Sequence, residues 1–161
     1  MNKFTVRNAV KADAAACYQL IIDLAIYEKE PEAVSNTLEQ FKEDGFGENP
    51  IYQLKVAESN EGEILGMALF FTAYSTWKGK MLYLDDLVVK EGCRRDGIGS
   101  SLIAALIEHA QDNGVKVVKW QVLDWNEPAI ELYKKLNMKL DEGWIDCKLY
   151  EDQIKSFSKP I

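Results

Sequence analysis

Residues 81–100 read MLYLDDLVVKEGCRRDGIGS, from Met81 to Ser100. The apolar residues of 81–89 predict an extended strand, in which neighbouring side chains point to opposite faces. Two adjacent carboxylates, Asp85 and Asp86, therefore lie mid-strand, one on each face. The expected faces are Tyr83, Asp85, Leu87 and Val89 on one side, and Leu82, Leu84, Asp86 and Val88 on the other.

A charged turn with two glycines follows this strand and leads into a helix. It reads RRDGIGS over residues 94–100, and apolar residues then recur at helical spacing from Ile98 to Leu106. The first backbone N–H groups of a helix have no intrahelical partner and lie at the positive end of its dipole. A basic, glycine-bearing helix start is therefore typical of a phosphate-binding turn. An ordinary strand-to-helix turn with surface arginines has the same composition, so both readings stay open at this point.

Two common phosphate-binding motifs are excluded. A Walker loop needs a Gly-Lys-Ser/Thr sequence, which does not follow the turn. A dinucleotide-binding G-x-G-x-x-G motif is also absent, because Gly97-Ile98-Gly99 continues into Ser-Ser-Leu-Ile.

Length and composition predict a single domain over residues 1–161. A hydrophobic content of 47% is enough for a substantial core. The net charge of -7, with no run of Lys or Arg, argues against a non-specific nucleic-acid binder. Small cations are natural partners for such a chain, although mild acidity is also ordinary for a cytosolic protein.

Cysteine and histidine usage argues against a zinc site or a disulfide framework. Cys17, Cys93 and Cys147 are widely separated, and His109 is the one imidazole in the sequence. The N-terminal residues MNKFTVRNAV contain no apolar signal core, and no stretch approaches membrane-spanning length. We therefore expect a reduced, cytoplasmic, soluble protein that needs no metal ion and binds no membrane.

Apolar periodicity and turn residues predict a mixed order of helices and strands. A first strand precedes two helices and an antiparallel meander, whose third strand begins at Met81. Two successive strand-helix-strand passages follow and imply crossover connections in a mixed sheet. The other expected strands are 4–7, 51–58, 63–73, 115–123 and 138–150, the last of which reads as a strand or a hairpin. The expected helices are 12–30, 38–44, one from residue 98, and 126–136.

A second motif lies at the start of the last predicted helix. Residues 123–133 read LDWNEPAIELY, which places Asn126 at a helix N-cap and Tyr133 two turns further on. Capping alone explains such an asparagine, and packing alone explains such a tyrosine. Together with the turn at 94–100, however, the pattern resembles the GNAT superfamily of acetyl-CoA-dependent N-acetyltransferases. There a basic R-x-x-G-x-G turn holds the pyrophosphate, and an Asn-x-x-Ala/Ser-x-x-x-Tyr helix flanks the acetyl end.

Four segments resemble the diamine acetyltransferase family, which includes spermidine/spermine enzymes and their thialysine-acetylating relatives. They are LAIYE at 24–28, EDGFGENP at 43–50, LYLDD at 82–86 and WNEP at 125–128, in the same order along nearly the whole chain. The resemblance implies an α/β (α+β) GNAT fold, a mixed twisted sheet of about six to seven strands with helices on both faces. It also implies a homodimer, with acetyl-CoA in a splay between two parallel strands.

Carried over by position, the resemblance assigns the cofactor-binding residues. The backbone of residues 87–89 would bond the pantetheine arm, residues 94–100 would surround the pyrophosphate, and residues 126–129 would line the cofactor's other side. Tyr133 would be the general acid that protonates the departing thiolate, and a backbone N–H near Leu87 would stabilise the carbonyl oxygen. The full set is Leu87, Val88, Val89, Arg94, Arg95, Asp96, Gly97, Ile98, Gly99, Ser100, Asn126, Glu127, Pro128, Ala129 and Tyr133.

Asp85 stands where this family has a glutamate implicated in deprotonating the amine, which cannot attack as an ammonium ion. Its side chain is shorter by one methylene, so a water molecule would have to relay the proton. An exposed or salt-bridged strand carboxylate is the alternative reading. The resemblance also implies an acidic, aromatic-edged pocket for the second ammonium of a diamine. The substrate-binding residues would be Tyr27, Glu28, Ser75, Trp77, Asp85, Asp86, Lys119, Trp120, Gln121 and Glu142.

The loop before Trp77 bears on the choice of amine. Polyamine-acetylating members carry an Asp-Pro pair before this tryptophan, whereas Ser75-Thr76 precedes it here. Losing that carboxylate removes an attraction for a distant cationic nitrogen. The sequence YSTWKG at 74–79 instead resembles the thialysine-acetylating branch. A lysine-like amine therefore ranks above spermidine.

The resemblance implies an enzyme that transfers an acetyl group from acetyl-CoA, by direct transfer in a ternary complex, to the terminal amine of a small molecule. Diamines, thialysine, lysine analogues, spermidine and spermine are the candidate acceptors. Acetylation of a protein or peptide amine is one alternative, because an acidic pocket suits a basic side chain too. A non-catalytic acyl-CoA-binding sensor is another, and such a sensor would not need an acid at Tyr133.

Overall fold

A computed structural model describes residues 3–157 of the chain. Contacts divide the chain into two compact units, with the boundary between Leu123 and Asp124. The predicted single domain over 1–161 includes residues 1–2 and 158–161, which lie outside the described residues, and it stays a prediction.

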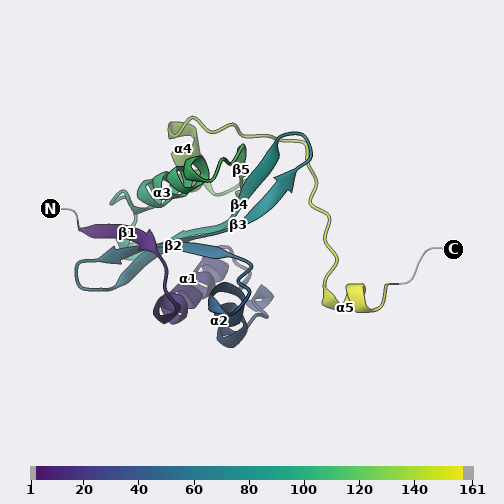
Figure 1. Cartoon of the computed structure of the whole chain (residues 1–161), viewed down its shortest axis with the longest axis horizontal. Coiled ribbons are helices and arrows are strands. Elements are labelled where there is room, and N and C mark those ends of the chain that lie inside the picture. The colour runs from purple at the N-terminus through teal and green to yellow at the C-terminus, as the bar shows by residue number, and fades with distance from the viewer. Residues whose placement is uncertain (1–2, 158–161) are drawn as a thin grey trace. The chain divides into compact units, whose positions relative to one another are not determined.

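The first unit is built on a five-stranded sheet in the order β1-β2-β3-β4-β5 (Figure 1). Neighbours from β1 to β4 are antiparallel, and β5 runs parallel to β4. A parallel pair needs a crossover connection, which helix α3 provides as predicted. The strands are β1 (Phe4–Asn8), β2 (Gln53–Ser59), β3 (Ile64–Ser75), β4 (Gly79–Val89) and β5 (Val117–Lys119).

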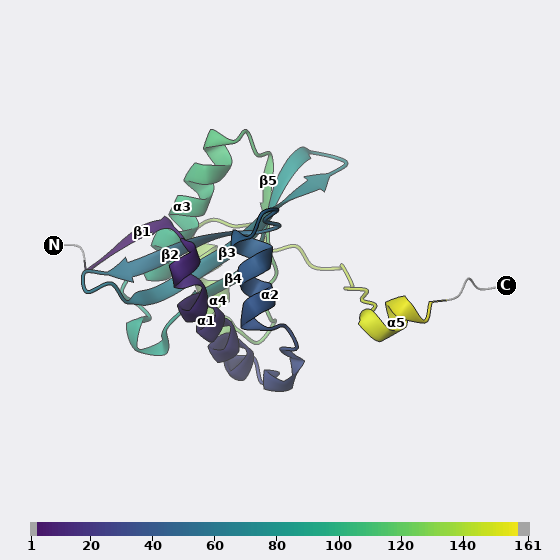
Figure 2. The same cartoon turned by 60° about the horizontal axis from the view of Figure 1, so that its bottom comes forward.

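Helices cover both faces of the sheet (Figures 1 and 2). α1 (Ala14–Tyr27) and α2 (Leu38–Phe46) lie on one face, and α3 (Ile98–Asp112) lies on the other. Their buried stripes form two apolar cores, one on each side of the sheet, as an amphipathic helix requires. Short 3₁₀ helices η1 (Lys11–Asp13), η2 (Pro31–Ala33) and η3 (Glu91–Cys93) lie in the connections. Within residues 3–157, no helix is long and apolar enough to cross a membrane.

A β-bulge interrupts strand β4. Leu84 pairs with Phe70 of β3, and Asp86 pairs with Leu69, the next β3 residue toward its N-terminus. Asp85 therefore has no Cα partner on β3 and is the extra residue of the bulge. An extra residue disrupts the ladder locally and redirects the side chains that follow it.

The bulge corrects the predicted faces of this strand. Leu82 and Leu84 pack into the core under α3, as even-numbered residues of a regular strand would. Val88 instead packs into the core under α1, and Asp86 lines a pocket beside that helix. The prediction that all four share one face is wrong, because a shift of one residue exchanges the two faces from the bulge onward.

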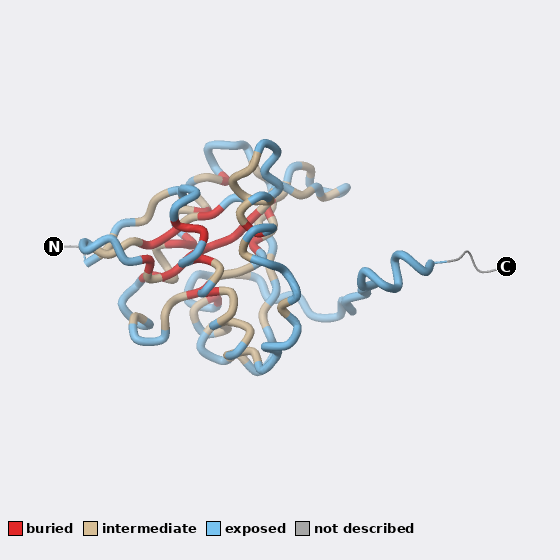
Figure 3. The backbone as a smooth tube through the Cα atoms, turned by 90° about the horizontal axis from the view of Figure 1, so that it is seen from below, coloured by how far each residue is buried: buried red, intermediate tan, exposed pale blue. Residues whose placement is uncertain are grey.

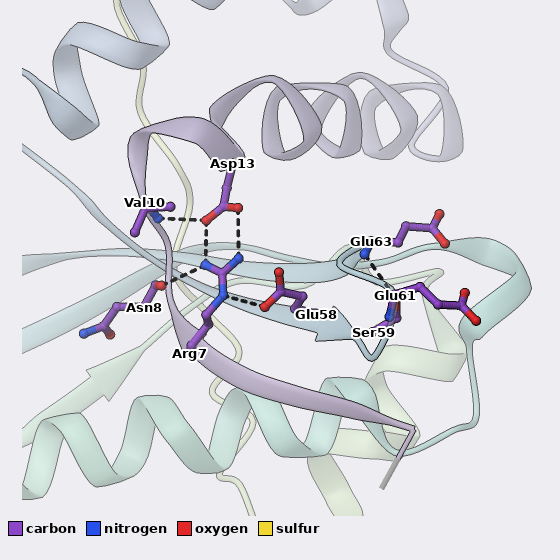
Figure 4. Close-up of polar contacts among 8 residues, drawn as sticks. All are labelled: Arg7, Asn8, Val10, Asp13, Glu58, Ser59, Glu61 and Glu63. Atoms are coloured by element: carbon purple, nitrogen blue, oxygen red, sulfur yellow. Dashed lines mark hydrogen bonds and ion pairs between the residues drawn. The ribbon is translucent and has the colours of Figure 1, made fainter.

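An ion-pair network joins β1, β2 and the chain entering α1 (Figure 4). Arg7 donates to both carboxylate oxygens of Asp13, at 2.7 and 3.0 Å, and through Nε to Glu58 Oε2 at 2.8 Å. The backbone N–H of Val10 also donates to Asp13, at 2.8 Å. The hydrogen bonds to Arg7 lower the pKa of Asp13, although burial opposes this. Asp13 is only 9% exposed, and its partners satisfy the charge.

The second unit contains α4 (Glu127–Lys135) and α5 (Glu151–Lys155). The strand predicted at 138–150 is not formed in the described chain, where this stretch has no regular structure. The sheet in residues 3–157 consequently has five strands rather than about six to seven, and the second predicted crossover does not occur. A strand must pair its N–H and C=O groups with a neighbour, and this segment has none. β5 is also shorter than the predicted 115–123.

Figure 3 shows that the segment after α4 is exposed. It carries large apolar side chains, including Trp144 at 77% exposure and Ile145 at 89%. Exposed rows of large apolar side chains are typical of interaction surfaces.

Candidate active site

A pocket of about 200 Å³ lies between the C-terminal end of α1 and the bulged part of β4. Three carboxylates line it, from Glu28, Glu30 and Asp86. We call this hollow the acidic pocket. Apolar side chains form the rest of its wall, which suits a molecule with an aliphatic chain and a cationic end. The lining residues are Ile21, Leu24, Ala25, Glu28, Glu30, Ala33, Val34 and Asp86.

The carboxylates at this end of β4 stay without a cationic partner. In the chain from residue 3 to residue 157, none of Glu28, Asp85 and Asp86 forms an ion pair with Lys or Arg. Burial, and then the charges of Asp85 and Glu28, raise the pKa of Asp86 to about 7. Burial also raises the pKa of Glu28 and that of Asp85, which has the most exposed side chain of the three. An unpaired, partly buried acidic group of this kind is more typical of a functional site than of a structural one.

Next to these carboxylates the two parallel strands diverge. β4 and β5 pair only at Met81 with Val117, Leu82 with Val118, and Tyr83 with Lys119. Beyond Tyr83, no strand among the described residues pairs with this edge of β4. Extended backbone at such an edge offers N–H and C=O groups to an extended ligand with amide bonds. The predicted pantetheine contacts at 87–89 lie along this open edge of β4.

The turn at 94–100 has a backbone suited to an anion. Gly97, the N-cap of α3, has φ +82°, and Arg95 has φ +71°. Both lie in the left-handed region, which Gly97 adopts without the steric cost that Arg95 incurs. Within the described chain no side chain caps α3, and a Cβ at Gly97 would meet no atom within 4 Å. The first N–H groups of this long helix are therefore open to phosphate oxygens.

Arg94 connects the predicted cofactor and substrate regions. Its Cζ lies 4.7 Å from the centroid of the Tyr27 ring, and its Nε donates to the Val89 carbonyl at 3.4 Å. The guanidinium thus covers an aromatic side chain at the end of α1, next to Glu28. Asp96 of the same turn lies 4.0 Å from Lys3 Nζ.

Residues 119–121, at the end of β5 and just beyond it, differ in their surroundings. The Tyr83 hydroxyl donates to Gln121 Oε1 at 2.8 Å, which holds Gln121 beside β4 just before the bulge. Trp120 packs instead against the core under α3. Lys119 pairs with Tyr83 in the strand ladder and is exposed. Of these three predicted substrate contacts, Gln121 is the one held on the side of the acidic pocket.

The structure does not bring Ser75 and Trp77 to the acidic pocket of the same chain. Ser75 pairs with Gly79 at the tip of the β3–β4 hairpin, and Trp77 is 84% exposed. From Gly79 to Asp85 an extended strand covers about 20 Å, at roughly 3.3 Å per residue.

Helix α4 of the second unit carries the remaining motif. Asn126 occupies the predicted N-cap position, but its side chain makes no capping hydrogen bond. Its backbone carbonyl accepts from Ala129 at 3.1 Å and Ile130 at 3.0 Å. Tyr133 is 6% exposed, whereas Glu142 lies in the exposed segment after the helix.

Sequence reasoning left two features of this site unassigned. The first is the part of the acidic pocket formed by Glu30 and by the apolar wall near Val34. The acidic residues directly before Pro31 were the sequence feature that could have indicated Glu30. The bulge at Asp85 had no sequence signal, because apolar and acidic residues continue through it without a glycine or proline. Across residues 3–157, no group of three or more His, Cys, Asp and Glu side chains could hold a metal ion.

Comparisons with known proteins agree with this geometry. Residues 14–138 match the model of the acetyltransferase (GNAT) family. The chain is 41% identical over 158 residues to a thialysine N-epsilon-acetyltransferase of Bos taurus, covering 92% of each chain. It is 35% identical to the Caenorhabditis elegans protein of that name, covering 98% of this chain and 99% of the relative. An aminoglycoside acetyltransferase from an uncultured soil metagenomic sample has the same fold, with TM-score 0.76, 18% identity and coverage of 92% and 97%.

Proposed function

The chain belongs to the acetyltransferase (GNAT) family, and on that premise we propose that it acetylates the terminal amine of a small diamine or lysine-like molecule. Members of this family use acetyl-CoA as co-substrate, so the chain is an acetyl-CoA-dependent N-acetyltransferase. The observation that carries the choice of acceptor is the acidic pocket, whose carboxylates have no cationic partner in the described chain. A cationic acceptor would supply that partner.

Three features of the first unit support the placement of acetyl-CoA. The open α3 N-terminus with Gly97 suits the pyrophosphate, and the turn from Arg95 to Ser100 would surround it. The edge of β4 over 87–89 suits the amide-bearing pantetheine arm. A backbone N–H near Leu87 would then stabilise the oxygen of the thioester carbonyl during attack. Residues 126–129 of the second unit are the proposed contacts on the cofactor's other side.

The proposed reaction is a direct transfer in a ternary complex. A carboxylate of the Asp85–Asp86 pair takes a proton from the ammonium group, because the cation has no lone pair with which to attack. The amine nitrogen then bonds to the carbonyl carbon, and the carbon–sulfur bond breaks. Tyr133 is the proposed acid that protonates the departing thiolate.

The relatives support a lysine-like acceptor over a polyamine. Four of them carry the name thialysine N-epsilon-acetyltransferase, and the chain matches 91–99% of their length. A human spermidine/spermine N(1)-acetyltransferase-like protein is 30% identical, over 22% of its length. The Ser75-Thr76 pair before Trp77 supports the same ranking.

A panel of amines tests the proposed function. Purified protein is mixed with acetyl-CoA and, separately, lysine, thialysine, ornithine, putrescine, spermidine or spermine, and the release of free thiol is followed. We expect thiol release with at least one of them, and the highest kcat/KM with thialysine or another lysine-like amine. No thiol release with any of the six would refute acetylation of small amines and direct attention to protein amines.

Substitution of Tyr133 tests the proposed acid. Tyr133→Phe keeps the ring that fills this buried position but removes the hydroxyl. We expect kcat to fall by about 10²-fold or more, with little change in the affinity for acetyl-CoA, as is usual when a general acid is lost. Unchanged turnover would remove Tyr133 from this role.

We further propose that the enzyme is a homodimer in which the segment 138–157 contacts a second copy. In this segment Ile145, Cys147 and Leu149 alternate with Asp146 and Lys148, which is the pattern of a strand with one apolar face. In the described chain this stretch forms no strand and is exposed. If this segment of one copy paired with the same segment of a second copy, each would cover the apolar face of the other. Such a contact is symmetric and closes as a dimer.

Light scattering after gel filtration tests the dimer. We expect twice the chain mass for the wild type, and a single chain mass at the same concentration for the double variant Ile145→Lys/Leu149→Lys. Lys148→Glu, on the polar face of the same segment, is the matched control and should remain dimeric. A wild-type protein of single chain mass at all concentrations would contradict the proposal.

A further inference from the structure

We infer that Asp86, rather than Asp85, accepts the proton from the attacking ammonium group. The inference deepens the proposed acetyl transfer and rests on it. The family's glutamate position is occupied by Asp85, and the role of base is here assigned to the next residue, Asp86. The reason lies in the β-bulge, which places these two adjacent carboxylates in different surroundings.

The bulge decides which carboxylate meets the acidic pocket. Asp85 is the extra residue, without a partner on β3, and its side chain is exposed and does not line the pocket. Asp86 pairs with Leu69 in the regular ladder that resumes after the bulge. Its side chain lines the pocket together with Glu28. An ammonium group bound there meets Asp86 directly, whereas the short side chain of Asp85 would need a water relay.

The groups that face Asp86 favour its proton-bound form. Asp85 adjoins it on β4, and Glu28 and Glu30 share the pocket from the end of α1 and the turn beyond, so all three are acidic. The remaining wall is apolar, from Leu24 and its neighbours. In the described chain no Lys or Arg pairs with Asp86. Burial, and then the charges of Asp85 and Glu28, raise its pKa to about 7, where an acid–base group works best at neutral pH.

One N–H bond of the ammonium breaks, and its proton moves to a carboxylate oxygen of Asp86 and from there to solvent. The free lone pair forms the carbon–nitrogen bond to the thioester carbonyl, and collapse of the intermediate breaks the carbon–sulfur bond. The nitrogen loses a second proton as the thiolate gains one. The products are an acetamide, a thiol and one proton released to water.

The matched variants Asp86→Asn and Asp85→Asn test the assignment with thialysine as acceptor and kcat/KM measured from pH 5.5 to 10. Wild type should show an acidic limb with its midpoint near the pKa of Asp86, about 7. Asp86→Asn should lose this limb and fall by about 10²-fold or more at pH 7.5. Asp85→Asn should fall less than about tenfold and keep the limb, shifted to lower pH, because the Asp85 charge helps to raise the pKa of Asp86.

High pH separates proton transfer from simple binding of the cation. If Asp86 is the base, the Asp86→Asn variant uses amine that arrives already neutral, so its kcat/KM should rise about tenfold per pH unit toward the amine pKa near 10. A deficit that stays constant or grows with pH would assign Asp86 to binding alone and overturn the inference. The reverse result, with limb loss and rescue in Asp85→Asn, would overturn it as well.

Two controls keep this test separate from that of the proposed function. Both variants should keep the wild-type affinity for acetyl-CoA, measured by calorimetry, which shows that the fold is intact. If wild type acetylates no amine of the panel, the proposed function fails. If wild type acetylates thialysine and Asp86→Asn keeps both its rate and its acidic limb, the inference fails and the proposed function stands.

Discussion

Two groups of carboxylates in the first unit contrast in their partners. Asp13 and Glu58 share Arg7, and their hydrogen bonds to it lower the pKa of both acids (Figure 4). Glu28, Asp85 and Asp86 gather at the C-terminal end of α1 and the bulge of β4, where no Lys or Arg of residues 3–157 pairs with them, and burial raises their pKa values. The same residue types are therefore paired in one place and unpaired in the other.

The difference separates stability from function. A paired carboxylate is more favourable folded than unfolded at neutral pH, so the Arg7 network strengthens the fold. A carboxylate with a raised pKa weakens the fold at neutral pH, because folding then has to bury a charge. Such a group costs stability, but it provides a site for a cation and for proton transfer. Carboxylates with perturbed pKa values are therefore expected at functional sites.

The largest expected effect comes from breaking the paired group. Asp13→Asn leaves Arg7 with Glu58 alone and weakens three hydrogen bonds to a group that is 9% exposed. We expect the free energy of unfolding at pH 7 to fall by about 1–3 kcal/mol, measured by urea denaturation. Glu58→Gln should cost less, because this carboxylate is more exposed. Equal losses from the two variants would mean that the burial of a carboxylate does not determine how much its ion pair with Arg7 contributes to the free energy of unfolding.

The pH dependence of that loss has a definite sign. The pKa of Asp13 is lowered from its ordinary value of 3.8, so its contribution is present above that pH and disappears as the pH falls through the lower folded value. The difference between wild type and Asp13→Asn should therefore hold from pH 5 to 8 and shrink below about 3.8. A difference that grows on acidification would contradict the pairing.

A smaller effect of opposite sign is expected from the unpaired group. Asp86→Asn removes a buried charge, so it should raise Tm at pH 8 by about 2–4 °C, roughly 1 kcal/mol for a chain of this size. The folded pKa of about 7 exceeds the ordinary 3.8, so the gain should grow as the pH rises from 4 to 7 and vanish below 4. Scanning calorimetry at pH 8 and pH 3.5 measures both values, and destabilisation at pH 8 would show that Asp86 is paired.

The smallest expected effect comes from the electrostatic interaction between Glu28 and Asp86. Glu28→Gln removes a negative charge that helps to raise the pKa of Asp86. The acidic limb of kcat/KM should therefore move to lower pH by a fraction of a unit, with the limb itself retained. Glu61→Gln, on the exposed β2–β3 turn, is the control and should leave the limb in place. An acidic limb that stays in place in Glu28→Gln would show that the two carboxylates do not interact.

The sequence predicted most of the sheet unit, because its signals are local. Apolar periodicity from Ile98 to Leu106, the glycines of the turn at 94–100 and the polar turn at 59–62 gave α3 and the β2–β3 hairpin within a few residues. The parallel pairing of β4 and β5 followed from the predicted strand-helix-strand crossover, and the resemblance implied that the two strands diverge.

What the sequence could not predict depends on partners distant along the chain. The bulge at Asp85 is a matter of register between β3 and β4, and no residue type marks it. The contact of Arg94 with Tyr27 joins residues of two different elements. The strand expected at 138–150 has the right pattern, but a pattern forms no strand without a neighbour to pair with.

The most direct test of the central claim is mass spectrometry of the product formed from thialysine and acetyl-CoA. We predict that the wild-type protein adds one acetyl group at the side-chain amine, and that Asp86→Asn forms this product at least about 10²-fold more slowly at pH 7.5. If no acetylated amine appears, while calorimetry shows that the protein binds acetyl-CoA, the unpaired carboxylates do not serve acetyl transfer to a small amine and the account is contradicted.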